Sequence, residues 1–260
     1  MLNGLNAVVT GSTSGIGLGI ANVLASKGAN LVINGFGDAA AIETERAGLE
    51  AKYGVKVVYS GADISKPAEV KAMIDLCVES FGKIDILVNN AGIQYTESVE
   101  DFPEERWHAI IAINLSGVFF GMQAALPYMQ SQGFGRIINI GSVHGLIGSK
   151  HKSAYVAAKH GVVGLSKVVA LENAGTGITC NTICPGWVHT PLVQKQIEAS
   201  AAENGISIEA ATEKLLIEKQ PSKQFVTPEQ LGELAAFLSS EAAAQMTGIA
   251  IPVDGGWTAQ

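Results

Sequence analysis

The sequence of 260 residues predicts an α/β protein with a doubly wound parallel sheet of seven strands and helices on both faces. Two observations lead to this fold class. Short runs rich in Val and Ile alternate with longer helical segments along the whole chain. These runs lack polar alternation, as strands do when both faces of their sheet are covered. Because no repeat or linker interrupts the pattern, we expect a single domain over residues 1–260.

Each strand and helix is expected from its own segment. The first strand covers AVVTG (7–11), and a helix patterned in Ala, Ile and Leu follows it to about Gly28. The remaining strands are expected at 30–35, 55–61, 84–90, 135–142, 177–185 and 249–254. Helical segments are expected before residue 55, from Pro67, before residue 135, over 153–174 and from Pro228. This order of elements is that of a Rossmann fold.

The longest departure from the alternation lies after Thr190, where some thirty residues, to about Pro221, precede the next core helix. This mostly helical segment is long for a connection in such a fold. Long insertions of this kind often serve as active-site lids. We therefore expect a helical substrate lid over about 187–221.

The overall composition excludes several classes of partner. A net charge of −7 and a pI of about 5.3 argue against nucleic acid. The first residues lack a basic region followed by a long apolar stretch, so we expect no signal peptide. Three cysteines without a CxxC spacing, Cys77, Cys180 and Cys184, indicate reduced thiols in a cytoplasmic protein. No cluster of ligand residues stands out, so we expect no metal.

One segment raises the question of a membrane span, because between Arg106 and Arg136 only His108 can carry a charge. Four residues make this stretch too polar for a helix exposed to lipid. They are Asn114, Gln123, Pro127 and Gln130. We expect instead a core helix buried on most of its sides, and no membrane partner.

The turn TGSTSGIG (10–17) follows the first strand and opens the first helix. Gly11, Gly15 and Gly17 permit a tight turn and a close approach of the backbone to a ligand. The free N–H groups at the start of the helix can then bind a pyrophosphate. Glycines also end strands for steric reasons alone, but the position at the first strand–helix junction favours a dinucleotide.

The residues after the second strand bear on the choice between NAD and NADP. An acidic side chain there binds the adenosine ribose, whereas Arg or Lys pairs with a 2′-phosphate. No Lys or Arg occurs between Lys27 and Arg46, which favours NAD. The acidic residue is also missing, so we expect Phe36 to form a wall of the adenosine pocket. Asp38 can simply be a helix N-cap.

Tyr155 and Lys159 stand four residues apart in a helical segment, which places them on one face of the helix. Oxidation of an alcohol removes its hydroxyl proton as hydride leaves carbon. A tyrosine can accept that proton if its pKa lies well below the usual ~10. A neighbouring ammonium and the charge of oxidised nicotinamide both act in that direction. Ser142, at the end of a predicted strand, can hydrogen-bond the substrate oxygen.

Other motifs accompany these residues in order along the chain. They are TGSTSGIG (10–17), Asp63, NNAG (89–92), Asn114, Ser142, Tyr155, Lys159, PG (185–186) and VDGGW (253–257). By these motifs the chain resembles the short-chain dehydrogenase/reductase family over essentially its full length. The pair Gly35 and Phe36 departs from the family pattern and bears on cofactor preference alone.

The resemblance implies roles for the catalytic residues. Tyr155 would be the general base, and Lys159 would hold the ribose and lower the pKa of Tyr155. Asn114 would anchor a water that relays the proton to solvent, although an Asn there can also cap or kink its helix. The catalytic set is therefore Asn114, Ser142, Tyr155 and Lys159.

The resemblance also implies contacts with the cofactor. Asp63 and Ile64 would touch adenine, Asn90 the ribose region, and Val188 and Thr190 the nicotinamide amide. Asp63 can also cap the next helix, and NNAG can be a turn. The expected NAD-binding residues are Gly11, Thr13, Gly15, Ile16, Gly17, Phe36, Asp63, Ile64, Asn90, Tyr155, Lys159, Pro185, Gly186, Val188 and Thr190.

The segment between Ser142 and Tyr155 carries four basic or titratable side chains. We expect Lys150 and His151 to be solvated on the surface. Lys152 and His144 are better placed to meet an anion, most simply the carboxylate of a short substrate. Gln94 and Gln196 can supply further donors, and Trp187 can cover the apolar part of the ligand. With Ser142 and Tyr155, these residues form the expected substrate site.

This set resembles the members of the family that act on 3-hydroxybutyrate. The resemblance implies reversible oxidation of (R)-3-hydroxybutyrate to acetoacetate with hydride transfer to NAD, a homotetramer and a lid that closes over a small anionic hydroxy or keto acid. The alternatives are a family member acting on another hydroxy acid, a sugar, a steroid or an acyl thioester, and a dinucleotide-binding sensor without catalysis.

Overall fold

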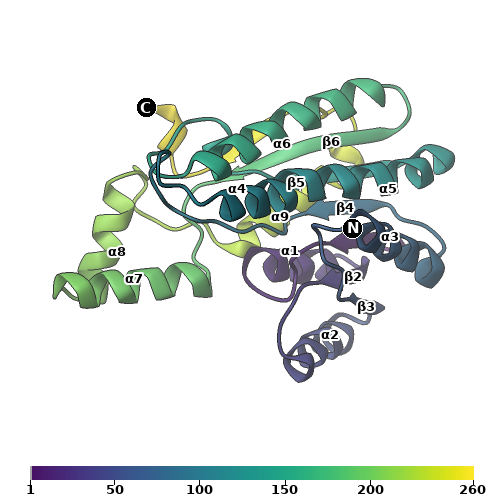
Figure 1. Cartoon of the computed structure of the whole chain (residues 1–260). Helices are drawn as coiled ribbons and strands as arrows, with labels where there is room; N and C mark the ends of the chain where they lie inside the picture. Colours follow the sequence, from purple (N-terminus) through teal and green to yellow (C-terminus); the bar gives the residue numbers. More distant parts are fainter. Residues whose placement is uncertain (1) are drawn as a thin grey trace.

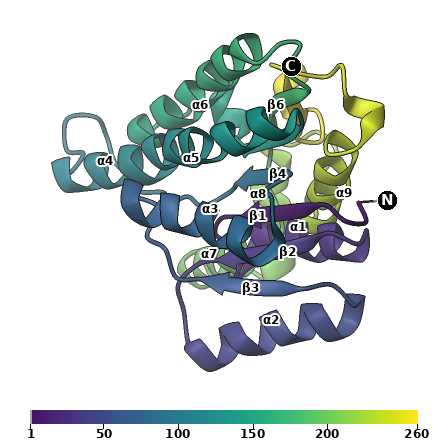
Figure 2. The ribbon, with the colours of Figure 1, turned by 90° about the vertical axis from the view of Figure 1, so that its right-hand side faces the viewer.

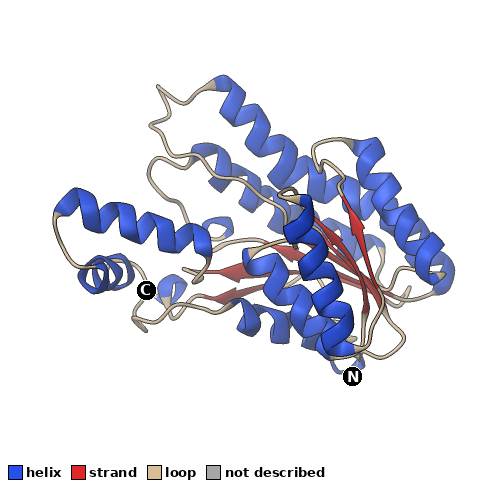
Figure 3. Ribbon diagram, turned by 90° about the horizontal axis from the view of Figure 1, so that it is seen from below, coloured by secondary structure: helices blue, strands red, loops and turns tan. Residues whose placement is uncertain are grey.

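Seven parallel strands form a sheet in the order β3-β2-β1-β4-β5-β6-β7 in the computed structural model, which describes residues 2–260. The strands are β1 (Asn6–Val9), β2 (Asn30–Asn34), β3 (Val57–Ser60), β4 (Ile86–Asn89), β5 (Gly135–Ile140), β6 (Ile178–Pro185) and β7 (Ala250–Val253). Figure 3 shows the strands between two layers of helices. The predicted doubly wound fold is confirmed.

The helices divide between the two faces of the sheet (Figures 1 and 2). On one face lie α1 (Gly15–Ser26), α2 (Ala39–Tyr53) and α9 (Pro228–Leu238). On the other lie α3 (Pro67–Phe81), α5 (Gly117–Gln132) and α6 (Ser153–Glu172), with α4 (Glu104–Ile111) leading into α5 through a π-helical turn at Ala112–Ser116. Successive strand residues face opposite cores: Val9 packs in the first and Val8 in the second. This explains the continuous apolar runs of the sequence.

The topology places a ligand site at one edge of the sheet. From β1 the chain proceeds outward to β2 and β3, and then returns to β4 on the other side of β1. At such a reversal the loops after the neighbouring strands diverge and leave a crevice at the carboxyl ends. The loops after β1 and β4 carry the glycine turn and NNAG.

Two helices, Glu104–Gln132 and Ser153–Glu172, are long and apolar enough to cross a membrane by length and composition. Both pack on the sheet, with Met122 and Val162 fully buried in the second core. The first is buried along its sheet-facing side and not on most sides as expected, since apolar side chains such as Trp107 and Phe119 remain 38% and 42% exposed.

The segment after Thr190 is helical, as expected, and projects from the sheet at the left of Figure 1. It consists of α7 (Pro191–Asn204) and α8 (Ile208–Ile217). The two helices share a small apolar cluster of their own, formed by Val193, Ile197, Ala201 and Ala211 with Trp187, Leu215 and Phe225 around it. A parallel bridge between Val188 and Val226 joins the two ends of the segment.

Candidate active site

A cavity of about 900 Å³ lies at the carboxyl ends of the strands. Loops after β1, β2, β4, β5 and β6 all contribute to its wall. Every residue expected at the site lines this cavity except Gly17 and Asn114. The structure therefore gathers the predicted catalytic, cofactor and substrate residues in one cleft.

The glycine turn leaves the start of α1 open to the cleft. Gly11 and Gly15 have φ of +62° and +54°, which residues with a Cβ rarely adopt. A Cβ on Gly11 would lie 2.9 Å from the Cα of Ala91, and Gly17 packs against the Gly11 carbonyl. Ser14 makes no capping hydrogen bond through its side chain, and the first turn of α1 has no acidic residue. This cradle fits a pyrophosphate, which would take up the free N–H groups.

Two asparagines hold the turn in place. The Asn34 Oδ1 accepts from the Gly11 N–H at 3.2 Å, while its Nδ2 donates to the Ser60 and Ala62 carbonyls. The Asn90 Nδ2 donates to the carbonyls of Thr10 and Gly11 at 2.9 and 3.0 Å. Asn90 thus lines the cleft and also anchors the turn. The role of Asn34 was not anticipated, because its partners are distant in sequence.

The end of the cleft where adenosine is expected carries Phe36, which is 69% exposed, and Asp63. Asp38 caps α2 by accepting from the Ala41 N–H at 2.9 Å, so the cap interpretation is confirmed. Asp63 does not cap α3. Its carboxylate accepts from the Ser65 N–H and hydroxyl, and these bonds lower its pKa. Asp63 therefore stays ionised at neutral pH.

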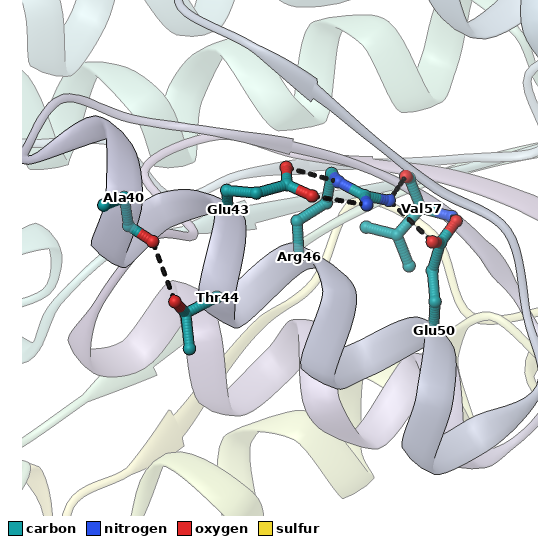
Figure 4. Close-up of polar contacts among 6 residues, drawn as sticks. All are labelled: Ala40, Glu43, Thr44, Arg46, Glu50 and Val57. Carbon is teal, nitrogen blue, oxygen red and sulfur yellow. Dashed lines mark hydrogen bonds and ion pairs between the residues drawn. The ribbon is translucent and has the colours of Figure 1, made fainter.

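Arg46, the first cation after β2, is committed elsewhere (Figure 4). Its guanidinium pairs with both carboxylate oxygens of Glu43, with Glu50 at 2.7 Å and with the Val57 carbonyl at 2.8 Å. Among the described residues that line the cleft, the only Lys or Arg side chains are Lys152 and Lys159. No cation of the cleft wall is thus available beside Phe36.

The three residues of the expected catalytic core meet where β5 ends. The Ser142 Oγ accepts from the His144 N–H at 3.2 Å. The Lys159 Nζ donates to the Ile140 carbonyl at 2.7 Å and lies 5.5 Å from the centre of the Tyr155 ring. The helical spacing of Tyr155 and Lys159 is therefore realised on α6, with the amine held against the strand that leads to Ser142.

Burial has opposite effects on the two titratable groups of α6. It lowers the pKa of Lys159 to about 8 and raises the pKa of Tyr155, which the nearby Ser142 hydroxyl opposes. Lys159 is still mostly charged at pH 7, whereas the phenol is protonated. The low pKa expected for Tyr155 is thus not a property of the chain without cofactor, and the positive charge of an oxidised nicotinamide would act in the lowering direction.

Asn114 lies in the π-helical turn and is fully buried. Its Oδ1 accepts from the Ile93 N–H at 2.9 Å, and its Nδ2 donates to the Ile93 carbonyl at 2.8 Å. The side chain therefore fixes the loop after β4 at the wall of the cleft. It neither caps α5 nor lines the cavity itself.

The substrate end of the cleft differs from expectation at His144. Burial and the charge of Lys152 lower the pKa of His144 to about 4, so the ring is neutral at pH 7 and can meet an anion only through an N–H. Its Nδ1 is buried without a hydrogen-bond partner. Lys152 is half-buried, and its Nζ lies 5.5 Å from the centre of the Trp187 ring.

Trp257, near the C-terminus, was missed as a residue of the site. It lines the cleft, with its ring 5.5 Å from His144 and 6.1 Å from Trp187 between centroids. The VDGGW motif was the available signal, but its distance in sequence hid the contact. Lys150 and His151 are exposed, as expected.

Comparison with known proteins agrees with this site. A family profile described as Enoyl-(Acyl carrier protein) reductase matches residues 11–258. The chain belongs to the short-chain dehydrogenase/reductase family, and is thus an oxidoreductase that uses a nicotinamide dinucleotide.

Three proteins illustrate which members of the family the chain is similar to. The chain is 60% identical to the D-beta-hydroxybutyrate dehydrogenase of Cupriavidus necator, over 100% of both chains. It is 52% identical to the enzyme of the same name from Rhizobium meliloti, over 98% of each. The crystal structure of levodione reductase superposes with a TM-score of 0.92 at 34% identity, covering 100% of this chain and 99% of that one. The predicted family resemblance is confirmed.

Proposed function

We propose that this chain reversibly oxidises (R)-3-hydroxybutyrate to acetoacetate with NAD as the hydride acceptor. The observation that carries this proposal is that the two lysines of the cleft wall have different environments. Lys159 is held by the Ile140 carbonyl next to Tyr155, so Lys152 is left to pair with an anion at the substrate end. A short acid with a secondary hydroxyl has one group for each position. The 60% identity to a D-beta-hydroxybutyrate dehydrogenase supports the same substrate.

The chain's own residues provide the acid–base chemistry. Bound NAD supplies the hydride acceptor and a positive charge close to Tyr155. Ser142 hydrogen-bonds the substrate oxygen, and Tyr155 takes the hydroxyl proton. The Lys159 ammonium stabilises the phenolate and holds the ribose. Asn114 fixes the cleft wall through Ile93, and since both polar groups of its side chain are paired there, a water that passes the proton to solvent would bind at its backbone.

The cofactor residues favour NAD over NADP within this proposal. The start of α1 would hold the pyrophosphate and Phe36 the adenosine, and the nicotinamide would be held by Pro185, Gly186, Val188 and Thr190, all of which line the cleft. A 2′-phosphate would add about two negative charges beside Phe36. No cation of the described chain lines the cleft there, and Arg46, the first cation after β2, is already paired with Glu43 and Glu50. A 2′-phosphate would therefore lack the ion pair through which NADP is usually recognised.

A panel of substrates tests the proposal. Initial rates are compared for (R)- and (S)-3-hydroxybutyrate and for 2-butanol, each with NAD and with NADP. We expect kcat/KM to be highest for the (R)-acid with NAD and to fall at least about a hundredfold without the carboxylate. Equal use of 2-butanol would remove the carboxylate argument, and equal use of NADP would remove the argument from Phe36.

We further propose that the chain is a single domain whose α7–α8 segment closes over the substrate, bringing Gln196 to the carboxylate. Both Gln196 and Gln94 line the cleft from exposed positions. Closure would exclude water and strengthen the contact with Lys152.

A homotetramer in the cytoplasm completes the proposal. Exposed apolar side chains on α4, α5 and α6, which lie beside one another in Figures 1 and 2, support association. They are Trp107, Phe119, Val168 and Leu171. The three buried, unpaired cysteines fit a reducing compartment. Light scattering at micromolar concentration tests the assembly, and a monomer would contradict it.

A further inference from the structure

Gln220 is a fully buried amide that follows α8, where the chain leaves the lid segment. Its Oε1 accepts from the backbone N–H of Trp187 at 2.9 Å, and its Nε2 donates to the Gln224 carbonyl. Its own backbone N–H donates to the Leu216 carbonyl at 2.8 Å. A buried amide is tolerated when its polar atoms are paired, so these bonds fix the side chain in one orientation.

Two turns of the chain meet at this side chain. A Cβ on Gly186 would lie 2.7 Å from the Gln220 Oε1, so the turn after β6 passes directly against the amide. A Cβ on Gly255 would lie 2.8 Å from the Gln220 Cγ, so the turn before Trp257 packs on the aliphatic part. Gln220 therefore touches both turns that carry the two tryptophans of the substrate end.

The neighbours of Trp187 have anchors of their own. The Gly186 N–H donates to the Val253 carbonyl at 3.0 Å, and the His189 N–H donates to the Val226 carbonyl at 3.0 Å. The backbone N–H of Trp187 donates to the side chain of Gln220 instead. The Trp187 carbonyl belongs to the same bridge, because it accepts from the Val226 N–H at 2.9 Å. The N–H of Trp187 has the Gln220 side chain as its partner, so the orientation of this peptide depends on Gln220 as well as on the bridge.

We infer that Gln220 is a positioning residue that sets substrate specificity by holding Trp187 beside Lys152 and Trp257. Gln220 does not line the cleft, so it acts on a bound ligand only through its neighbours. Its effect should therefore appear in KM for the substrate more than in kcat or in NAD binding. The identity of that substrate rests on the proposed function, but the positioning role applies to any alcohol that this chain oxidises.

In the variant Gln220→Glu, the pH decides whether the side chain can still donate a hydrogen bond. A protonated carboxyl accepts from Trp187 and donates to Gln224 as the amide does, and burial favours that form. A carboxylate still accepts but cannot donate, and it faces the Gln224 carbonyl. We expect KM for the substrate, divided by the wild-type value at each pH, to be near one at acid pH and to rise about tenfold at alkaline pH. The affinity for NAD should change less than about twofold.

Gln132→Glu is the matched control, because Gln132 donates through the same kind of amide to the Ile84 and Phe134 carbonyls, away from the cleft. It should lower the unfolding temperature as Gln220→Glu does, without a pH-dependent KM. Gln220→Met carries no charge and should raise KM equally at every pH. An unchanged KM in both Gln220 variants, with only their stability lowered, would overturn the inference.

Tryptophan fluorescence, measured without substrate, tests the positioning of Trp187 independently of the proposed function. In a Trp107→Phe background the remaining emission comes from Trp187 and Trp257. With Gln220→Glu added, we expect the emission to change with pH in parallel with KM. Emission that matches the background variant at every pH would contradict the positioning of Trp187. The wild-type substrate panel alone decides whether 3-hydroxybutyrate is the substrate.

Discussion

Replacing Lys152 by alanine is expected to raise KM for 3-hydroxybutyrate by about 10–100-fold. An ammonium about 4 Å from a carboxylate gains about 4 kcal/mol at an effective dielectric constant of about 20, which suits a half-buried site. Loss of hydration offsets part of this, and charged hydrogen bonds in proteins contribute about 1.5–3 kcal/mol net. Since about 1.4 kcal/mol corresponds to tenfold, the predicted range of KM follows.

The assay follows NADH absorbance at saturating NAD. Lys152→Arg keeps the charge and should recover much of the affinity, while turnover of 2-butanol should not change in either variant. The affinity for NAD should also stay constant, because Lys152 lies at the substrate end. An unchanged KM in Lys152→Ala would refute the assignment and would move the anion contact to the N–H of His144.

The same residue gives a pH dependence. Burial and the positive charge of Lys219 lower the pKa of Lys152. The ammonium is therefore lost at a lower pH than in free lysine, and KM for the acid should rise on the alkaline side. Lys219→Gln removes one cause of the low pKa, so it should shift this rise to higher pH. A rise at the same pH in wild type and variant would contradict the electrostatic coupling.

Three further predictions concern the catalytic base, the buried histidine and the cofactor. Tyr155→Phe should lower kcat by at least about a thousandfold with little change in NAD affinity, and activity within a few-fold of wild type would exclude Tyr155 as the base. The pKa of His144 is about 4 in the folded chain and ~6.5 in the unfolded one. Below pH ~6.5 the unfolded chain binds a proton that the folded chain does not, so the free energy of unfolding falls by about 3 kcal/mol as the pH drops toward 4. The free energy of unfolding of His144→Gln, measured with urea, should therefore fall less over that pH range than that of the wild type. Phe36→Arg should raise the NADP/NAD ratio of kcat/KM at least about tenfold, whereas an unchanged ratio would place the adenosine ribose elsewhere.

The sequence predicts those features that depend on local pattern. Continuous apolar runs mark strands buried on both faces, and the four-residue spacing of Tyr155 and Lys159 requires a shared helix face. The N-cap of Asp38 is equally local. The strands are one to three residues shorter than predicted, in part because residues such as Thr10 and Gly11 already belong to the turn after β1.

Features that depend on packing between distant segments escape such patterns. Asn34 holds the glycine turn only because β2 pairs with β1. Trp257 meets His144 across more than a hundred residues of sequence, through the position of β7 beside β6. The directions of the pKa shifts of Tyr155 and His144 follow from burial, which spacing alone does not reveal.

The apolar cluster of α7 and α8 is separate from the two main cores, and this bears on how the segment can move. Since Val193, Ile197 and Ala211 pack on one another rather than on the sheet, the closure proposed above would move the pair as a unit without opening either main core. The bridge between Val188 and Val226 would confine that movement to the base of the segment. Admission of substrate would then be uncoupled from global unfolding, so the rate at which the cleft opens would not depend on the stability of the sheet.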